Sequence, residues 1–167
     1  PGPSLAAASG AARAAMALAG ARPGPHLVSQ HLCIGGQAEA ADRQRLMGLG
    51  VTHVLNAARQ LPNYHPEFFV YLKLDLIDNP DQPLAPHRAA AVGFLRHVEA
   101  LGGRALVHCV AGCSRSVSLV LMHLMEAHGM WLRDALAHVR LHRPVACPNE
   151  GFRFELAMLE VRFLSTS

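Results

Sequence analysis

The chain has 167 residues, of which 51% are hydrophobic and 16% are charged, a balance typical of one globular domain with a substantial core. The net charge is only +3. Because the lysines and arginines are scattered along the chain, the sequence argues against a nucleic-acid-binding surface. No run of about 18 uninterrupted apolar residues occurs, so we expect no membrane span.

The first 25 residues differ in composition from the rest of the chain. They are mostly Ala, Gly, Ser and Pro, and no acidic residue precedes Glu39. We interpret residues 1–25 as an appended tail, flexible or marginally helical, and residues 26–167 as a single folded domain.

Regular patterns begin at residue 26. LVSQHLCIGG at 27–36 predicts two short strands ending in a Gly-Gly turn, and residues 37–48 predict a helix. Residues 51–57 and 69–76 predict two further strands. In the second of these, alternating residues form one apolar face, namely Val70, Leu72, Leu74 and Leu76.

The second half of the chain continues the alternation of helices and strands. Residues 86–101 have helical apolar spacing, and ALVHC at 105–109 is typical of a buried strand. A helix that is apolar nearly all round follows from about Arg115, and two amphipathic helices are expected around 132–139 and 152–163. The sequence therefore predicts an α/β fold, with a central, mostly parallel, twisted sheet flanked by helices.

The segment HCVAGCSRS at 108–116 joins the predicted buried strand to the predicted buried helix. A helix N-terminus at the carboxyl end of a strand attracts anions, because it presents unpaired N–H groups and a partial positive charge. The small residues Ala111 and Gly112 allow successive N–H groups to form a concave nest for a tetrahedral oxyanion. Arg115 adds a planar fork that can bind two phosphate oxygens.

Cys109 stands at the mouth of this predicted nest. Its thiolate would be stabilised by the helix dipole, the amides and Arg115, which would make Cys109 a nucleophile at neutral pH. Attack on a bound phosphorus atom would give a cysteinyl-phosphate. The alternative interpretation, a buried structural thiol, would leave the small residues and Arg115 unexplained.

These residues contain the Cys-x5-Arg signature HCxxGxxRS and resemble the protein tyrosine phosphatases, specifically the atypical dual-specificity phosphatases with their usual form HCxAGxSRS. RPVACPNEGF at 143–152 is similar to that group's RPxxxPNxGF segment, and the resemblance covers about residues 26–163. The resemblance implies that the folded domain is a phosphatase catalytic domain in which Cys109 is the nucleophile, Arg115 binds phosphate and Ser116 assists the leaving thiol. The phosphate nest would comprise Val110, Ala111, Gly112, Cys113, Ser114 and Arg115.

A proton donor for the leaving group is expected on the loop LIDNPDQPL at 76–84. The family places its general acid about thirty residues before the cysteine, and Asp78 has this spacing, so we predict Asp78 as the acid. Asp81 is the alternative. Asp75 lies within the predicted strand and is expected to face solvent or cap the sheet.

Four further residues have supporting or neutral interpretations. We predict that His108 orients the loop by hydrogen bonding, and that Asn149 ties neighbouring loops together or caps the final helix. His138 and His142 are four residues apart but lack the acidic partner of an HExxH motif, so we interpret them as surface residues.

Cys113 is predicted to be a small packing residue, with a disulfide to Cys109 as the redox alternative. Where the family usually has an Ala-Tyr pair after the signature, this chain has Met122-His123, which alters the packing behind the site.

The predicted function is hydrolysis of phosphotyrosine, and of phosphoserine or phosphothreonine, in protein substrates. The nest lacks the additional Lys or Arg that a multiply phosphorylated ligand would favour. The alternatives are a phosphatase of a phosphoinositide, phosphoglycan or nucleotide, and a phosphate-binding adaptor without turnover. We expect no cofactor and no metal. The four cysteines lack the paired CxxC spacing of zinc sites. Four is also a low density for a disulfide scaffold, which favours a reducing compartment, cytoplasmic or also nuclear.

Overall fold

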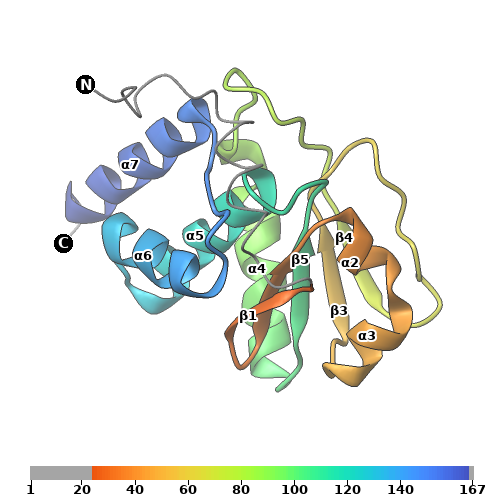
Figure 1. Cartoon of the computed structure of the whole chain (residues 1–167). Helices are drawn as coiled ribbons and strands as arrows, with labels where there is room; N and C mark the ends of the chain where they lie inside the picture. Colours follow the sequence, from red (N-terminus) through yellow and green to blue (C-terminus); the bar gives the residue numbers. More distant parts are fainter. Residues whose placement is uncertain (1–23, 166–167) are drawn as a thin grey trace, which may run out of the picture.

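The computed structural model describes residues 24–165, and within this range five strands form one sheet in the order β1-β2-β5-β3-β4 (Figure 1). The first pair is antiparallel, and the other three neighbouring pairs are parallel. The prediction of a mostly parallel sheet flanked by helices is therefore confirmed. The strands are β1 (His26–Ser29), β2 (Leu32–Gly35), β3 (His53–Asn56), β4 (Val70–Lys73) and β5 (Ala105–His108).

Helices cover both faces of the sheet. α4 (Arg88–Ala100), preceded by a short 3-10 turn at Ala85–His87, packs with the next three helices over one face, and the short α2 and α3 lie on the other (Figure 1). The remaining helices are α2 (Gln37–Ala41), α3 (Arg43–Gly48), α5 (Arg115–His128), α6 (Leu132–His142) and α7 (Glu150–Ser165).

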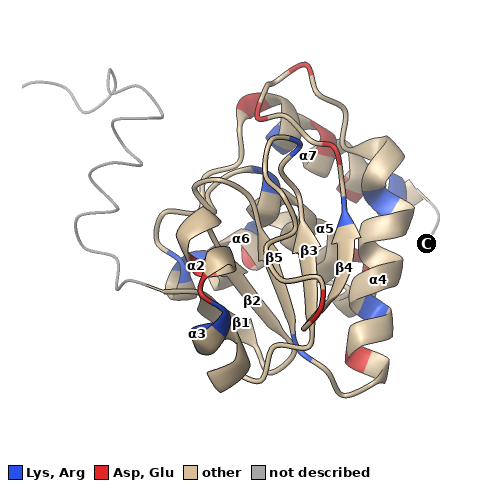
Figure 2. Ribbon diagram, turned by 90° about the vertical axis from the view of Figure 1, so that its right-hand side faces the viewer, with Lys and Arg blue, Asp and Glu red and all other residues tan. Residues whose placement is uncertain are grey.

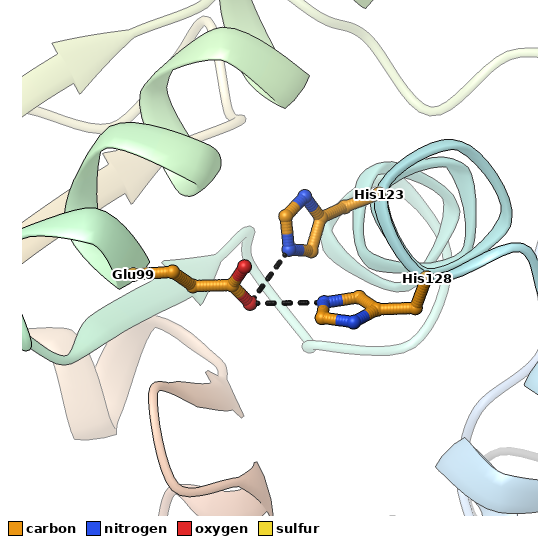
Figure 3. Close-up of side chains that lie close together, drawn as sticks. All are labelled: Glu99, His123 and His128. Atoms are coloured by element: carbon orange, nitrogen blue, oxygen red, sulfur yellow. Dashed lines mark hydrogen bonds and ion pairs between the residues drawn. The ribbon is translucent and has the colours of Figure 1, made fainter.

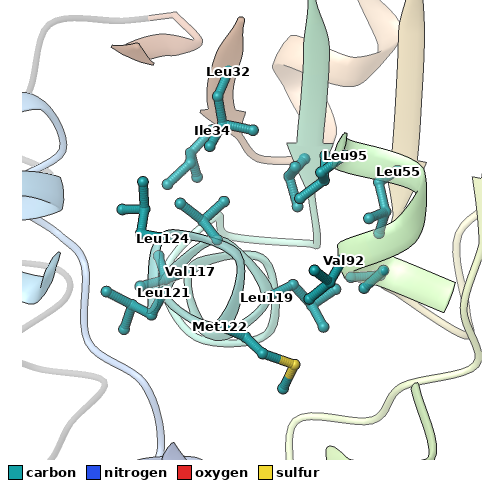
Figure 4. Close-up of a cluster of buried hydrophobic side chains, with 14 of the residues drawn as sticks. Leu32, Ile34, Leu55, Val92, Leu95, Val117, Leu119, Leu121, Met122 and Leu124 are labelled. Carbon is teal, nitrogen blue, oxygen red and sulfur yellow. The ribbon is translucent and has the colours of Figure 1, made fainter. Parts of the chain in front are cut away.

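The central strands are apolar on both faces because both faces are covered. In β5, Leu106 packs toward α2 and α3, while Ala105 and Val107 belong to the larger core on the opposite face. α5 lies within that larger core, and side chains from the strands and from α4 surround it (Figure 4). Every residue of α5 from Arg115 to Met125 is buried, as the nearly all-round apolar pattern predicted.

The prediction of a single helix over residues 37–48 is wrong. The backbone breaks at Asp42, which ends α2 and begins α3. The Asp42 carboxylate accepts a hydrogen bond from the Arg45 N–H at 3.0 Å, a typical N-cap contact. Because the Asp42 side chain can cap a helix, it stabilises the start of a second helix here. The apolar spacing of the sequence continues through Asp42 and so does not reveal this break.

The strand predicted over residues 69–76 is shorter than expected. β4 covers only Val70–Lys73, and Val70, expected on the apolar face, is 57% exposed. β4 is an edge strand of the sheet, so one side of it lacks a neighbouring strand. Leu74 and Leu76, which follow the strand, are buried as predicted, and Asp75 is exposed beyond its end.

The parallel strands end at a common edge. In the observed register Gly35 and Asn56 both pair with His108, and Asn56 also pairs with Lys73. The loops that follow these four strands therefore emerge side by side at the carboxyl edge, where α/β proteins bind their ligands.

The lysines and arginines of the described part of the chain are distributed over several elements and form no continuous basic stripe (Figure 2). Among residues 24–165, no helix is both long and apolar enough to cross a membrane. The interpretation of residues 1–25 as a tail concerns a segment that, apart from residues 24 and 25, lies outside the described residues.

We predict that Asp42→Ala lowers the free energy of unfolding by about 1 kcal/mol, because it removes the N-cap of α3. Urea denaturation measures this change. Glu67→Ala is the matched control, since Glu67 is exposed and lies outside the helices. An equal loss of stability in both variants would show that the cap is not responsible.

Candidate active site

The loop from Cys109 to Ser114 connects β5 to α5 at the carboxyl edge of the sheet. Arg143, which is only 3% exposed, binds the outer side of this loop. Arg143 donates from Nε to the Gly112 carbonyl at 2.6 Å and from Nη2 to the Ala111 carbonyl at 3.1 Å. Gly112 has a φ of 65°, and a Cβ here would lie 2.5 Å from the Gly35 carbonyl oxygen, so only glycine fits.

Two further carbonyls of the loop are bound by neighbouring backbone. The Val110 carbonyl accepts a hydrogen bond from the Gln37 N–H at 2.8 Å, and the Cys113 carbonyl accepts one from the Cys147 N–H at 2.8 Å. The four carbonyls of residues 110–113 are thus all occupied by other segments. Because N–H and C=O groups of one peptide point in opposite directions, the amides of the loop are left to face the concave side.

Cys109 lies directly after β5 and is 2% exposed. Its Sγ accepts a hydrogen bond from the Gly112 N–H at 3.2 Å and lies 3.3 Å from the Ser116 Oγ. Ser116 belongs to the first turn of α5 and is fully buried. The predicted nucleophile and its predicted hydroxyl partner are therefore in direct contact.

Arg115 is the first residue of α5 and is 4% exposed. Its Nη1 donates to the Gln60 side-chain oxygen at 3.0 Å and to the Leu76 carbonyl at 3.3 Å. Its Nε is buried and has no hydrogen-bond partner among residues 24–165. A buried guanidinium with one nitrogen bound to the protein and another unpaired is arranged to receive an anion.

Gln60 was not singled out from the sequence. It lies on the loop after β3, and this loop is held by the buried Asn56, whose Nδ2 donates to the Leu61 and Pro62 carbonyls at 3.1 Å each. Lys73, from the neighbouring strand, also donates to the Leu61 carbonyl. The one local signal was Asn56, a polar residue at the end of an apolar strand; no pattern marked Gln60 itself.

Asp78 lies on the loop after β4 and is exposed. Its Oδ1 accepts a hydrogen bond from the Asn149 Nδ2 at 2.9 Å. The same loop rests on the first turn of α7, where a Cβ on Gly151 would collide with the Pro80 backbone. Asp81, the alternative acid, is also exposed, and its N–H donates to the Asn79 Oδ1 at 2.8 Å in a local turn.

Asn149 joins three segments that are distant in the sequence. Besides its bond to Asp78, its N–H donates to the Ser114 Oγ at 2.9 Å, and its Oδ1 accepts from the Phe152 N–H at 2.9 Å. The last contact is an N-cap of α7. Both interpretations made from the sequence, a tie between loops and a helix cap, are observed together.

His108 is fully buried at the end of β5. Its Nδ1 lies 3.3 Å from the Cys109 carbonyl, so the ring donates from Nδ1, and Nε2 has no partner among the described residues. Burial lowers the pKa of His108 to about 4, and the positive charges of Lys73 and Arg115 act in the same direction. A neutral His108 that binds the loop backbone agrees with the predicted orienting role.

Cys113 is buried, and all four cysteines of the chain are free thiols. Burial raises the pKa of the Cys113 thiol to about 11; the neighbouring Cys109 and, more weakly, Asp78 add to this shift. The thiol therefore stays protonated near neutral pH. This favours the packing interpretation, while the redox alternative stays a prediction.

The interpretation of His138 as a surface residue holds only in part. His138 is half-buried, and its Nε2 donates to the Val28 carbonyl of β1 at 2.8 Å. α6 packs against this edge of the sheet, a neighbour that helical spacing alone does not reveal. His142 is exposed, as predicted, and its ring lies 5.1 Å from that of His138.

Comparison with known proteins agrees with this geometry. The family profile described as "Dual specificity phosphatase, catalytic domain" matches residues 32–162. Dual specificity protein phosphatase 1 of Arabidopsis thaliana is 42% identical over 136 residues, which cover 81% of this chain and 69% of that protein. Protein phosphatase Slingshot homolog 3 of Mus musculus is 39% identical over 126 residues, but these cover 75% of this chain and only 19% of that protein.

Solved structures give the same result. Human DUSP28 superposes with a TM-score of 0.81 at 30% identity, covering 85% of this chain and 99% of that chain. DUSP15 superposes with a TM-score of 0.76 at 30% identity, covering 83% and 88%. The fold and the Cys-x5-Arg loop define the class of cysteine-based protein tyrosine phosphatases. Within this class the chain belongs to the dual specificity phosphatases, in their atypical group.

The buried His108 should make stability depend on pH. Its folded pKa of about 4 lies below its ordinary value, so the unfolded chain binds the extra proton first as the pH falls. The contribution of neutral His108 to the free energy of unfolding is fully present above about pH 6.5, and it is lost as the pH falls toward 4. His108→Gln should reduce the slope of unfolding free energy against pH in this window, by up to about 1.4 kcal/mol per pH unit.

The slope is measured by urea denaturation at several pH values, and it is independent of any overall destabilisation caused by the substitution. Equal slopes in the parent and in His108→Gln would contradict a neutral, buried His108.

Proposed function

We propose that this chain hydrolyses phosphate monoesters on tyrosine, and on serine or threonine, of protein substrates. The observation that carries the proposal is the loop at residues 109–115. Its carbonyls are occupied on the outer side, and the Cys109 Sγ accepts a hydrogen bond from the Gly112 amide. The Arg115 Nε is buried and has no hydrogen-bond partner within residues 24–165. This arrangement supports a dianionic phosphate held next to a thiolate.

In the first step the Cys109 thiolate attacks phosphorus. The S–P bond forms as the bond between phosphorus and the leaving oxygen breaks, and Asp78 transfers its proton to that oxygen. The contact between Asp78 and Asn149 supports this role, because Asn149 also binds Ser114 and so keeps the acid near the cysteine loop.

In the second step water attacks the cysteinyl-phosphate. Asp78, now a carboxylate, accepts a proton from the water, the S–P bond breaks and inorganic phosphate leaves. The thiolate is the leaving group of this step, and the Ser116 hydroxyl at 3.3 Å can donate a hydrogen bond to it. His108 is a positioning residue, since it binds the backbone of Cys109 and stays neutral.

A singly phosphorylated protein side chain is the substrate that the site supports best. The nest residues Val110 to Ser114 carry no basic side chain, so the charge available for binding comes from the amides and Arg115. The two residues at the outer lip, Val110 and Ala111, are exposed and uncharged. The residues of the nest therefore provide no basic side chain for the additional phosphates of a phosphoinositide. The free thiols favour a reducing compartment, and we place the activity in the cytoplasm or nucleus.

A phosphate-binding role without turnover is the competing hypothesis. One solved neighbour, titled as a human tyrosine phosphatase-like serine/threonine/tyrosine-interacting protein, superposes with a TM-score of 0.77 at 30% identity. The fold alone therefore does not decide between catalysis and binding. The simultaneous presence of Cys109, Arg115 and Asp78 in this chain favours catalysis.

We predict that Cys109→Ser abolishes release of phosphate from phosphotyrosine peptides, because it removes the nucleophile, while peptide binding persists. Arg115→Lys keeps the charge but loses the planar fork, so both binding and turnover should fall. Acid quenching during turnover should trap phosphate on the parent chain and none on Cys109→Ser. A parent chain that binds phosphopeptides but forms no phosphoenzyme would support the adaptor hypothesis instead.

Asp78→Asn should lower kcat on phosphotyrosine by about 100- to 10,000-fold, because the leaving phenoxide loses its proton donor. The loss should be much smaller on an aryl phosphate with an acidic phenol. The asparagine oxygen can still accept the hydrogen bond from Asn149, so the loop geometry is kept. Asp81→Asn is the matched control and should resemble the parent; if the two variants exchange these results, Asp81 is the acid.

A further inference from the structure

Three side chains with metal-binding chemistry lie together on the face of α5 that packs against α4. Glu99 stands at the C-terminal end of α4, His123 lies in α5, and His128 is the last residue of α5. Figure 3 shows both imidazole rings directed at the Glu99 carboxylate. Each Nε2 approaches the same oxygen, Oε1, at 2.9 Å for His123 and 3.1 Å for His128.

The cluster is buried on the side of His123 and open to solvent on the side of His128. The side chain of His123 is 1% exposed, that of Glu99 is 23% exposed and that of His128 is 45% exposed. A cation could therefore enter past His128 and meet ligands whose inner members are already fixed by packing. A partly enclosed site with a solvent path is what a small metal ion requires.

We propose that Glu99, His123 and His128 form a Zn²⁺ site. Two imidazole nitrogens and one carboxylate oxygen are a common ligand set for zinc, and water would occupy the fourth tetrahedral position. The three ligand atoms all lie within 4.8 Å of one another. Zinc holds such ligands at about 2.0 to 2.2 Å, so neighbouring ligand atoms must be about 3.4 Å apart. The Glu99 Oε1 lies 2.9 and 3.1 Å from the two Nε2 atoms, which is close to this separation.

Two neighbouring features limit the affinity. The other ring nitrogen of His123, Nδ1, is buried without a hydrogen-bond partner in the described part of the chain. Loss of such a supporting bond weakens a metal site by about 10- to 100-fold. The guanidinium of Arg96, which donates to the Glu126 carbonyl at 2.8 Å, places a positive charge near His123. We therefore expect moderate rather than very tight binding.

The site is distant from the catalytic loop. Arg115 begins α5 and His128 ends it, and 14 residues at about 1.5 Å each place them about 20 Å apart. Zinc at this position would join the C-terminal ends of α4 and α5, the two helices that lie against the same core. We therefore expect zinc to stabilise the domain. We expect it to make no contact with the cysteine loop.

The test uses the full chain carrying Cys109→Ser, because a reactive thiolate also binds zinc. At a Zn²⁺ concentration about 100 times the Kd, the unfolding equilibrium constant should fall about 100-fold, which corresponds to a rise in Tm of about 5 to 10 °C. Co²⁺, used as a coloured substitute for zinc, should give the visible absorption of a tetrahedral nitrogen and oxygen site. It should lack the near-ultraviolet band of thiolate ligation, which would indicate the exposed Cys147 instead.

His128→Gln, added to the same chain, should weaken Zn²⁺ binding by at least about 10-fold and remove the rise in Tm. Glu99→Gln should act in the same direction. The matched control is His142→Gln, which alters the other close histidine pair, 5.1 Å apart on α6, and should bind zinc as the parent does. The proposal is overturned if His128→Gln keeps the parent affinity, if His142→Gln loses it, or if the Cys109→Ser chain binds no Zn²⁺ at millimolar concentration.

Discussion

The cysteine loop depends on hydrogen bonds made to its outer side. A backbone carbonyl points toward its hydrogen-bond donor. Four successive carbonyls of this loop accept hydrogen bonds from α2, from Arg143 and from the segment before α7. Without these donors the loop could turn its carbonyls inward, and a ring of carbonyl oxygens would repel phosphate. The concave array of amides is therefore a product of the surrounding protein as much as of the loop sequence.

The same surroundings connect the parts of the proposed mechanism. Asn149 binds Asp78 through its side-chain amide, Ser114 through its backbone N–H and the first turn of α7 through Oδ1, so one residue links the loop of Asp78 to the cysteine loop. Gln60 binds Arg115 from a loop that Asn56 and Lys73 hold in place. The guanidinium is thereby held in place by the protein, and such preorganisation would reduce the entropy lost in the proposed binding of phosphate.

α5 connects the two ends of the domain. Its first turn carries Arg115 and Ser116, and its last turn carries His128, which faces Glu99 on α4. The helix is buried along most of its length and packs against both α4 and β5. Restraint at its C-terminal end by the proposed zinc site would act on the stability of the whole core, while the catalytic end keeps its own hydrogen bonds.

By itself the sequence determined the α/β class, the order of most elements and the residues of the signature loop, because periodicity and the Cys-x5-Arg spacing are local properties of the chain. It failed where a single side chain competed with the pattern, as Asp42 did when it divided the helix expected over 37–48. Only the tertiary structure decided that Gln60 and Arg143 support the site and that Glu99 meets His123 and His128. These contacts join residues that are 24 or more positions apart, and no local pattern records which distant donor will meet a buried acceptor.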